Sequence, residues 1–212
     1  DLRHDPYMAS SLLRCADIIT VHDLIGFVVS GYETSAWVRL YNRMAAASVR
    51  RARLILADSQ ATAADLERVL GISESRIRVI PLGVSEKLAP APTHMVTAIC
   101  ARYNLPSRFV LYLGSGDKRK NLNLLLQSWS LIPKAERVPL VLAGDIPCAG
   151  TELFPDYRLL ARQLDVDSSV IWLGPISEGD KASLLSAAAV FVFPSLYEGF
   201  GLEPLEAMAC GT

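Results

Sequence analysis

The chain has 212 residues, of which 51% are hydrophobic and 20% are charged, and its formal net charge is −1 at pH 7. This composition excludes a disordered chain and is sufficient for the core of one large domain or two smaller ones. So small a net charge provides no overall field that would attract nucleic acid or an anionic membrane, so anion-binding chemistry must be local. The four cysteines are widely scattered and form no CxxC pair, which argues against a zinc site or a disulfide framework and indicates a reducing compartment.

The first half of the chain alternates short apolar runs with helical patterns. Strands are expected at residues 17–21, 54–57 and 76–80. An amphipathic helix is expected over residues 34–53, because apolar residues recur there at helical spacing, at Trp37, Leu40, Tyr41, Met44 and Ala47. A second helix is expected after the second strand, where Thr62 and Asp65 have the spacing of a capping box and Gly71 supplies a stop.

The second half repeats this alternation more clearly. Strands are expected at residues 109–113, 140–143, 170–173 and 190–193, and helices at 121–131, 157–164, 178–188 and from Pro204 onward. Strands that alternate with helices predict an α/β fold with parallel sheets and right-handed crossovers. Prolines at 90, 92 and 106 mark a change of character, so we expect one domain at 1–90, an interdomain linker at 91–106 and a second domain at 107–212.

Ligands of parallel α/β sheets bind at the carboxyl ends of strands, so the loops that follow strands are the candidate sites. The loop after residues 109–113 begins Gly114-Ser115-Gly116 and continues into Lys118, Arg119 and Lys120 at the start of a helix. Small residues let backbone N–H groups approach a ligand, and three cations at a helix start would suit a pyrophosphate. The segment is neither a P-loop nor a GxGxxG motif, and a solvated basic turn remains an alternative.

Two glutamates follow the last strand, with Glu198 in a loop and Glu206 in the first turn of the helix expected from Pro204. They would stand at successive depths along one wall, where an ionised carboxylate can accept hydrogen bonds from a vicinal diol of a sugar or ribose. A role for Glu206 in merely capping its helix remains open. His22 follows the first strand and is a further candidate, although a single histidine at this position can equally be structural.

These segments together resemble a known family. EGFGLEPLEAMACGT, at residues 198–212, resembles the E-x7-E signature of retaining GT-B glycosyltransferases in the glycosyltransferase group 1 family. Further segments resemble that family in the same order along nearly the whole chain, namely VHDLIGF, ADSQATAADL, RIRVIPLGV, VLYLGSGDKRKNLNLLLQSW and VIWLGPISEGDKASLLSAAAVFVFPSLYEGFG. Leu82 stands where the family usually has asparagine, and the KRKN form resembles mannosyltransferase-like members that act on polysaccharide precursors.

The resemblance implies a GT-B fold, with two Rossmann-like domains and parallel sheets. Residues 1–90 would form part of the acceptor-side domain, and residues 107–212 part of the donor-binding domain. The residues it implies in catalysis are His22, Lys120 and Glu198. The residues it implies in donor binding are Arg119, Lys120, Glu198, Gly199, Phe200, Gly201, Leu202 and Glu206.

The implied roles are specific to each side chain. Lys120 would bind the donor diphosphate with Arg119 as its helper, because Ser115 stands where the family carries an arginine. Glu198 would hold the hydroxyls of the transferred sugar, and Glu206 would bind the ribose diol. The backbone from Gly199 to Leu202 would contact sugar and phosphate, and His22 would face the transferred sugar.

The activity implied is a metal-independent hexosyl transfer, with retention, from a nucleotide-diphosphate sugar to a glycan or lipid-linked acceptor. We expect GDP-mannose or a UDP-sugar as co-substrate, no cofactor, no nucleic acid partner, and a cytoplasmic location that includes peripheral association with the inner face of the membrane. Another GT-B enzyme, such as a sugar-nucleotide epimerase or a phosphorylase, and a nucleotide-sugar-binding module without activity are the alternatives. Because the chain begins at Asp1 and stops at Thr212, we expect a fragment with both domains incomplete and no activity by itself.

Overall fold

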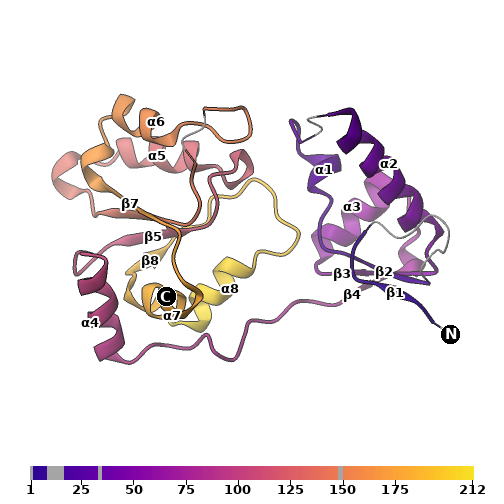
Figure 1. Ribbon diagram of the computed structural model, residues 1–212, viewed down its shortest axis with the longest axis horizontal. Coiled ribbons are helices and arrows are strands. Elements are labelled where there is room, and N and C mark those ends of the chain that lie inside the picture. The colour runs from indigo at the N-terminus through magenta and orange to yellow at the C-terminus, as the bar shows by residue number, and fades with distance from the viewer. Residues whose placement is uncertain (1, 9–16, 33–34, 148–149) are drawn as a thin grey trace. The chain divides into compact units, whose positions relative to one another are not determined.

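The computed structural model describes residues 2–8, 17–32, 35–147 and 150–212 (Figure 1). It divides into two compact units. The first comprises Asp1–Gly83 and the segment Tyr197–Gly201, and the second comprises Val84–Leu196 and Leu202–Thr212. Within the described residues no helix is both long and apolar enough to cross a membrane. Cys100 and Cys210 are free thiols, whereas Cys15 and Cys148 lie outside the described residues.

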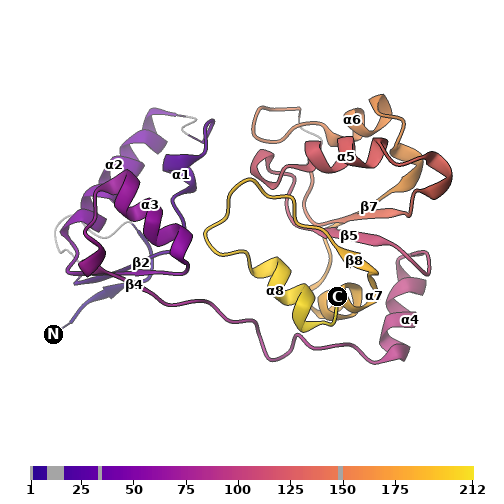
Figure 2. The same ribbon diagram turned by 180° about the vertical axis from the view of Figure 1, so that it is seen from behind.

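The first unit contains a four-stranded parallel sheet whose strands lie in chain order. The strands are β1 (His4–Asp5), β2 (Ile18–Val21), β3 (Leu54–Ala57) and β4 (Ile77–Val79). The helices are α1 (Ile25–Val28), α2 (Ala36–Arg51), α3 (Gln60–Leu70) and the 3-10 turn η1 (Glu74–Arg76). The two long helices, α2 and α3, lie on the same face of this sheet (Figure 1 and Figure 2). Their inner residues pack against buried strand residues to form the core, which includes Ile19, Val21, Val49, Ile55, Leu66 and Leu70.

The N-terminal cap of α3 differs from the expected one. Ser59, not Thr62, is the N-cap, and its hydroxyl accepts a hydrogen bond from the Thr62 N–H at 3.0 Å. Serine and threonine are both good caps, and the sequence offers one of each three residues apart, so the pattern alone could not select between them. The expected stop is confirmed, because Gly71 ends the helix in the left-handed conformation with φ of 67°.

Helix α2 forms where expected, but its large apolar residues do not lie on the buried side. Its buried residues are Asn42, Ala45, Ala46, Ser48 and Val49. Four of the five apolar residues whose spacing predicted an amphipathic helix are exposed, namely Trp37, Leu40, Tyr41 and Met44. The small side chains of Ala45 and Ala46 let the helix approach the sheet closely, a packing requirement that a search for large apolar residues misses. Thr34, the expected first residue, lies outside the described residues.

The second unit contains another four-stranded parallel sheet, in the order β7-β6-β5-β8. Its strands are β5 (Val110–Leu113), β6 (Leu140–Ala143), β7 (Val170–Gly174) and β8 (Val190–Phe191). Its α-helices are α4 (Thr93–Arg102), α5 (Leu122–Ser130), α6 (Tyr157–Gln163), α7 (Glu178–Ala187) and α8 (Leu202–Ala209). The short 3-10 turns are η2 (Lys118–Lys120), η3 (Lys134–Glu136) and η4 (Asp167–Ser169).

Helices cover both faces of the second sheet. One face carries α5 and α6, and the other carries α4, α7 and α8 (Figure 1 and Figure 2). Alternate residues of the same strand therefore point into two separate cores, with Tyr112 in the first and Leu111 and Leu113 in the second. Burial on both faces explains why β6 reads as a continuous apolar run, Leu-Val-Leu-Ala, with every residue buried.

Two boundaries in the second unit differ from those expected. Residues 91–106, interpreted as an interdomain linker, contain α4, and Val84 is the first residue of this unit. A partly buried network holds α4 to α7, since Arg102 and Tyr103 both donate to Asp180 at 2.8 Å. Helix α8 begins at Leu202 rather than Pro204. Proline lacks an N–H but fits any position of a first helical turn, so it marks the turn without marking its first residue.

Candidate functional site

A cavity of about 340 Å³ opens at the carboxyl edge of the second sheet. Its lining residues come from the loops that follow β5, β6 and β7 and from the nearby faces of α7 and α8. They are Leu113, Gly114, Ser115, Gly144, Asp145, Pro175, Ile176, Ser177, Glu178, Lys181, Glu203 and Glu206. The position agrees with the rule that ligands of parallel α/β sheets bind beyond the carboxyl ends of strands.

Glycines make this edge compact. Gly114 and Gly144 directly follow the paired residues Leu113 and Ala143 of β5 and β6. Gly144 has a φ of 115°, and a Cβ atom placed there would lie 1.9 Å from the Gly114 carbonyl oxygen. Only glycine combines this conformation with so close an approach. Neighbouring backbones can therefore meet at this edge, where the N–H groups of Gly114 and Gly144 donate to the carbonyls of Ala143 and Gly174.

The strand order locates a second feature of this edge. The chain passes outward from β5 to β6 and β7, and then returns to place β8 on the other side of β5. The order therefore reverses between β5 and β8, and such a switch point opens a crevice for a ligand. The two loops that leave these strands are joined here, because Asn121 donates its side-chain amide to the Pro194 carbonyl and Leu196 N–H donates to the Arg119 carbonyl.

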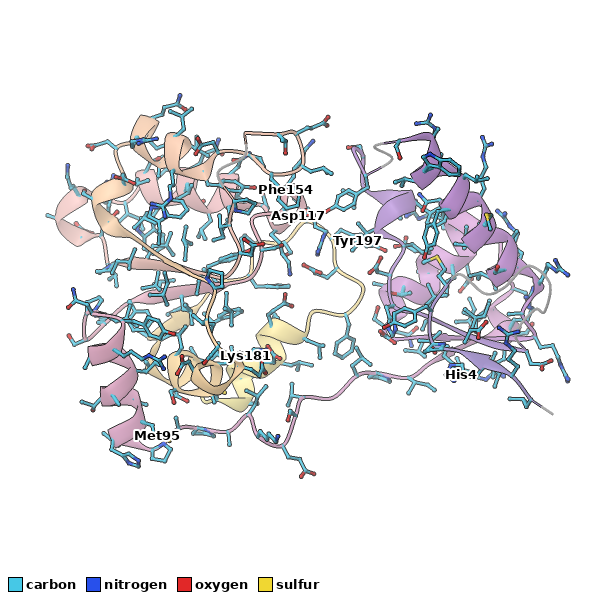
Figure 3. All side chains as sticks on the ribbon, in the orientation of Figure 1. His4, Met95, Asp117, Phe154, Lys181 and Tyr197 are labelled. Atoms are coloured by element: carbon cyan, nitrogen blue, oxygen red, sulfur yellow. The ribbon has the colours of Figure 1, made fainter. Side chains whose placement is uncertain are left out.

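Lys120 lies in the loop after β5 and is 5% exposed. Its Nζ donates to Glu203 Oε1 at 2.5 Å and lies 5.1 Å from the centroid of the Phe193 ring. Asp117 builds the turn that carries it, since one of its carboxylate oxygens accepts a hydrogen bond from the Arg119 N–H at 2.8 Å (Figure 3). This buried lysine is thus held by packing and by an ion pair, in contrast to the solvated basic turn that remained an alternative.

Glu206 is held by a cation on the neighbouring helix. Lys181 of α7 donates to Glu206 Oε1 at 2.6 Å, and both side chains are mostly buried (Figure 3). Because α8 begins at Leu202, Glu206 lies in its second turn, and the first turn carries Glu203 instead. The expectation that Glu206 lies in the first turn is therefore wrong, and its carboxylate lines the cavity beside Lys181.

Glu203 is a site residue that the sequence analysis missed. It lines the cavity and forms the short ion pair with Lys120. Glu203 stands in the EGFGLEPLE segment, between the two glutamates that define the E-x7-E signature, and that signature assigns it no role. An earlier helix start would have placed it on the wall that carries Glu206, one turn of helix away.

His22 and Asp58 meet in the first unit. The register pairs Val21 of β2 with Ala57 of β3, so the residues that follow emerge side by side. His22 Nδ1 lies 2.6 Å from Asp58 Oδ2, and its Nε2 lies 3.1 Å from the Pro6 carbonyl oxygen. Asp58 is buried, so it can fix the orientation of the half-exposed imidazole. Asp58 was quoted in a family-like segment without a role, and strand pairing is the signal that identifies it.

The segment Tyr197–Gly201 belongs to the first unit and lies against the carboxyl ends of the same strands. The Gly199 carbonyl accepts hydrogen bonds from Ser59 and Thr62, and a Cβ atom at Gly199 would lie 2.0 Å from the His22 carbonyl oxygen. Tyr197 donates to Asp65 at 2.7 Å (Figure 3). Burial raises the pKa of Tyr197, and the bond to Asp65 raises it further, so the phenol keeps the proton that it donates.

The expected site residues thus fall into two groups. Glu198, Gly199, Phe200 and Gly201 lie in the same unit as His22, whereas Arg119, Lys120, Leu202 and Glu206 lie in the other. Within each group, the residues gather at the carboxyl ends of parallel strands or at the helix that follows.

Known proteins resemble this chain in both sequence and structure. The family model described as "Glycosyl transferases group 1" matches residues 102–212, and that described as "Glycosyltransferase Family 4" matches residues 4–88. The O-antigen chain mannosyltransferase B of Escherichia coli is 32% identical over 213 residues, which cover 98% of this chain and 54% of that protein.

Solved structures share the fold. Sucrose-phosphate synthase from Thermosynechococcus elongatus is 31% identical, with a TM-score of 0.72 over 92% of this chain and 48% of that one. HepE from Anabaena, solved in complex with UDP and glucose, is 21% identical, with a TM-score of 0.76 over 94% of this chain and 52% of that one. The chain therefore spans about half the length of these relatives.

Proposed function

Since the chain belongs to the glycosyltransferase group 1 family, we propose that the whole protein transfers a hexosyl group from a nucleotide-diphosphate sugar to a glycan or lipid-linked acceptor. The observation that carries this proposal is the cavity at the carboxyl edge of the second sheet, beside the buried Lys120. A cavity of this size is on the scale of a nucleotide, and its wall combines glycine backbone with polar side chains.

We propose one orientation of the donor along this wall. Its ribose hydroxyls can donate to the Glu206 carboxylate, which Lys181 holds at 2.6 Å. Its diphosphate then lies toward the loop after β5, where Lys120 and Arg119 supply positive charge. Lys120 must turn part of its hydrogen bonding from Glu203 to the phosphate, which its three N–H donors permit.

The chemistry breaks the bond between the sugar C1 and the diphosphate oxygen and forms one between C1 and the acceptor oxygen, while the proton of the acceptor hydroxyl passes to the leaving diphosphate. Negative charge builds on the leaving oxygen, and Lys120 with Arg119 stabilises it, usually the largest contribution to such a rate enhancement. Because these side-chain cations do this, we propose that no metal ion is required. His22 and Glu198 contact the transferred sugar in this scheme, and Asp58 orients His22.

Retention of anomeric configuration is also proposed, because residues 198–212 resemble the E-x7-E signature of retaining GT-B glycosyltransferases. The relative from Escherichia coli is a mannosyltransferase, which supports mannose as the transferred sugar and GDP-mannose as the donor, with a UDP-sugar as the alternative. The protein would act in the cytoplasm, and a lipid-linked acceptor would bring it to the inner face of the membrane.

The test is turnover of the full-length protein with GDP-mannose and with UDP-sugars, measured as released nucleoside diphosphate. We expect Lys120→Ala to lower turnover by about a hundredfold, the scale of losing one charge-stabilising group. Lys118→Ala is the matched control. Lys118 lies in the same turn as Lys120 but forms an ion pair with the exposed Glu152. Equal turnover of the two variants would refute the role of Lys120, and absence of turnover with every donor would refute the proposed function.

A further inference from the structure

The loop that carries Glu198 is anchored by the residue directly before it. Residues 197–201 form neither helix nor strand, so contacts with other elements determine where Glu198 lies. The hydroxyl of Tyr197 accepts a hydrogen bond from the Leu24 N–H at 3.3 Å. The same hydroxyl donates to Asp65 Oδ2 at 2.7 Å. Tyr197 is therefore tied both to the loop after β2 and to helix α3.

A second anchor follows directly after Glu198. The Gly199 carbonyl accepts hydrogen bonds from Ser59 and from Thr62, and Thr62 is fully buried. The backbone also packs closely here, because a Cβ atom at Gly199 would lie 2.0 Å from the His22 carbonyl oxygen. With a fixed residue on each side, the Glu198 backbone has little freedom to move.

Asp65 has no local reason to be buried in α3. Ser59 is the N-cap, so Asp65 lies in the second turn, too far along the helix to cap its free N–H groups. Aspartate is a poor helix former in the interior of a helix, and a buried carboxylate is costly unless it is paired. Asp65 is 8% exposed, and its Oδ1 accepts from Arg68 of the same helix at 2.5 Å. Its other oxygen, which accepts from Tyr197, makes the bond that reaches beyond the helix.

We propose that Asp65 and Tyr197 are positioning residues that hold Glu198 in place for hexosyl transfer. The Asp65 carboxylate holds the Tyr197 hydroxyl, and Tyr197 holds the backbone of the residue that follows it. Neither side chain needs to touch the sugar. This inference rests on the proposed function, in which Glu198 contacts the transferred sugar. The nucleotide wall, with Lys181 and Glu206, lies in the second unit and does not depend on this hydrogen bond.

The first test is turnover of the full-length Tyr197→Phe variant, measured together with the inhibition constants of GDP and UDP. A misplacement of about 1 Å can cost about a hundredfold in rate, so a loosened contact should lower kcat by about tenfold and leave both inhibition constants unchanged. Tyr103→Phe is the matched control, because it removes another tyrosine-to-aspartate hydrogen bond, from Tyr103 to Asp180 at 2.8 Å in the second unit. Arg68→Ala is a second control, since it removes the other partner of Asp65. Both controls should turn over as the wild type does.

Double variants separate positioning from a general loss of stability. If Tyr197 acts through Glu198, then Tyr197→Phe should have no further effect on turnover in the Glu198→Ala background. Two independent effects would instead multiply. Likewise, Asp65→Ala/Tyr197→Phe should lose no more turnover than the more affected of its two single variants. Losses that multiply in the Glu198→Ala background would overturn the proposal, as would wild-type kcat in Tyr197→Phe.

Hydrogen exchange of the full-length protein tests the contact without an activity assay. The amides of residues 198–201 should exchange about tenfold faster in Tyr197→Phe, because the loss of one hydrogen bond to a charged group favours local opening of the segment. In Tyr103→Phe they should exchange at the wild-type rate, and equal exchange in all three proteins would overturn the proposal. Absence of turnover in the wild type would instead refute the proposed function, whereas faster exchange in Tyr197→Phe would still show that Tyr197 holds the segment.

Discussion

Replacing Glu203 with glutamine removes the carboxylate that accepts a 2.5 Å hydrogen bond from Lys120 Nζ. In the wild type, an incoming diphosphate competes with that carboxylate for the same ammonium group. The amide of glutamine is a weaker, uncharged acceptor, so the variant should bind nucleoside diphosphate more tightly. A hydrogen bond that involves a charged group contributes about 1.5–3 kcal/mol, and with Lys120 still charged we place the wild-type carboxylate near the top of this range and the amide near its lower end. The difference, about 1 kcal/mol, corresponds to roughly fivefold tighter binding.

The same substitution should destabilise the empty protein. The Lys120 side chain is 6% exposed and that of Glu203 is 26% exposed, so the pair is largely shielded from water. Loss of one partner from a fully buried pair costs about 3–5 kcal/mol, and partial exposure with a remaining amide acceptor lowers this to about 1–2 kcal/mol. Stability and nucleotide affinity should therefore change in opposite directions.

Isothermal titration with GDP and UDP measures the affinity, and urea denaturation without nucleotide measures the stability. Glu178→Gln is the matched control, because Glu178 lines the same cavity but its side chain is 86% exposed and lies 4.0 Å from Lys181. The competition is refuted if Glu203→Gln binds nucleoside diphosphate no more tightly than Glu178→Gln does.

Asp58→Asn should lower turnover of the full-length protein by about tenfold while nucleotide affinity stays unchanged, because the 2.6 Å partner of the His22 imidazole loses its negative charge. Asp180→Asn should change the pH dependence of the unfolding free energy. The hydrogen bond from Tyr103 holds the pKa of Asp180 below its ordinary value, so its stabilisation is present above the ordinary pKa and is lost as pH falls through the lowered one. Gly144→Ala should lower the melting temperature sharply, since its Cβ atom would lie 1.9 Å from a carbonyl oxygen.

Each of these three predictions has a control and a contradicting result. Asp58→Asn should differ from Asp23→Asn in turnover but not in nucleotide titration, and equal turnover would contradict the orienting role. Urea midpoints at pH 7 and near pH 3 should converge between wild type and Asp180→Asn at the acid end, and a constant difference would contradict the linkage. Gly179→Ala adds a Cβ atom that meets one side-chain atom at 3.8 Å, so a loss of stability equal to that of Gly144→Ala would contradict the steric argument.

Local sequence patterns were sufficient for most of the elements. Apolar runs such as Leu140–Ala143 and stops such as Gly71 depend on neighbours in the chain, and the structure places them where expected. The α/β class with parallel sheets followed from their alternation. The order of the strands did not, because nothing local determines on which side of β5 the last strand is added.

The predictions that were wrong or incomplete concern features that tertiary packing determines. The buried face of α2 consists mostly of small and polar residues such as Ala46 and Asn42, which pack closely, whereas the large apolar residues lie on another side of the helix. Lys120 was proposed from its sequence context, but its partner Glu203 lies 83 residues away and is brought near only by the fold. Asp58 likewise required the register between β2 and β3.

The most direct measurement is a crystal structure of the full-length protein with a bound nucleoside diphosphate. The proposed function predicts diphosphate oxygens within hydrogen-bond distance of Lys120 Nζ and ribose hydroxyls against the Glu206 carboxylate. A nucleotide bound away from the carboxyl ends of β5 and β6, or one that leaves the Lys120–Glu203 pair untouched, would contradict it.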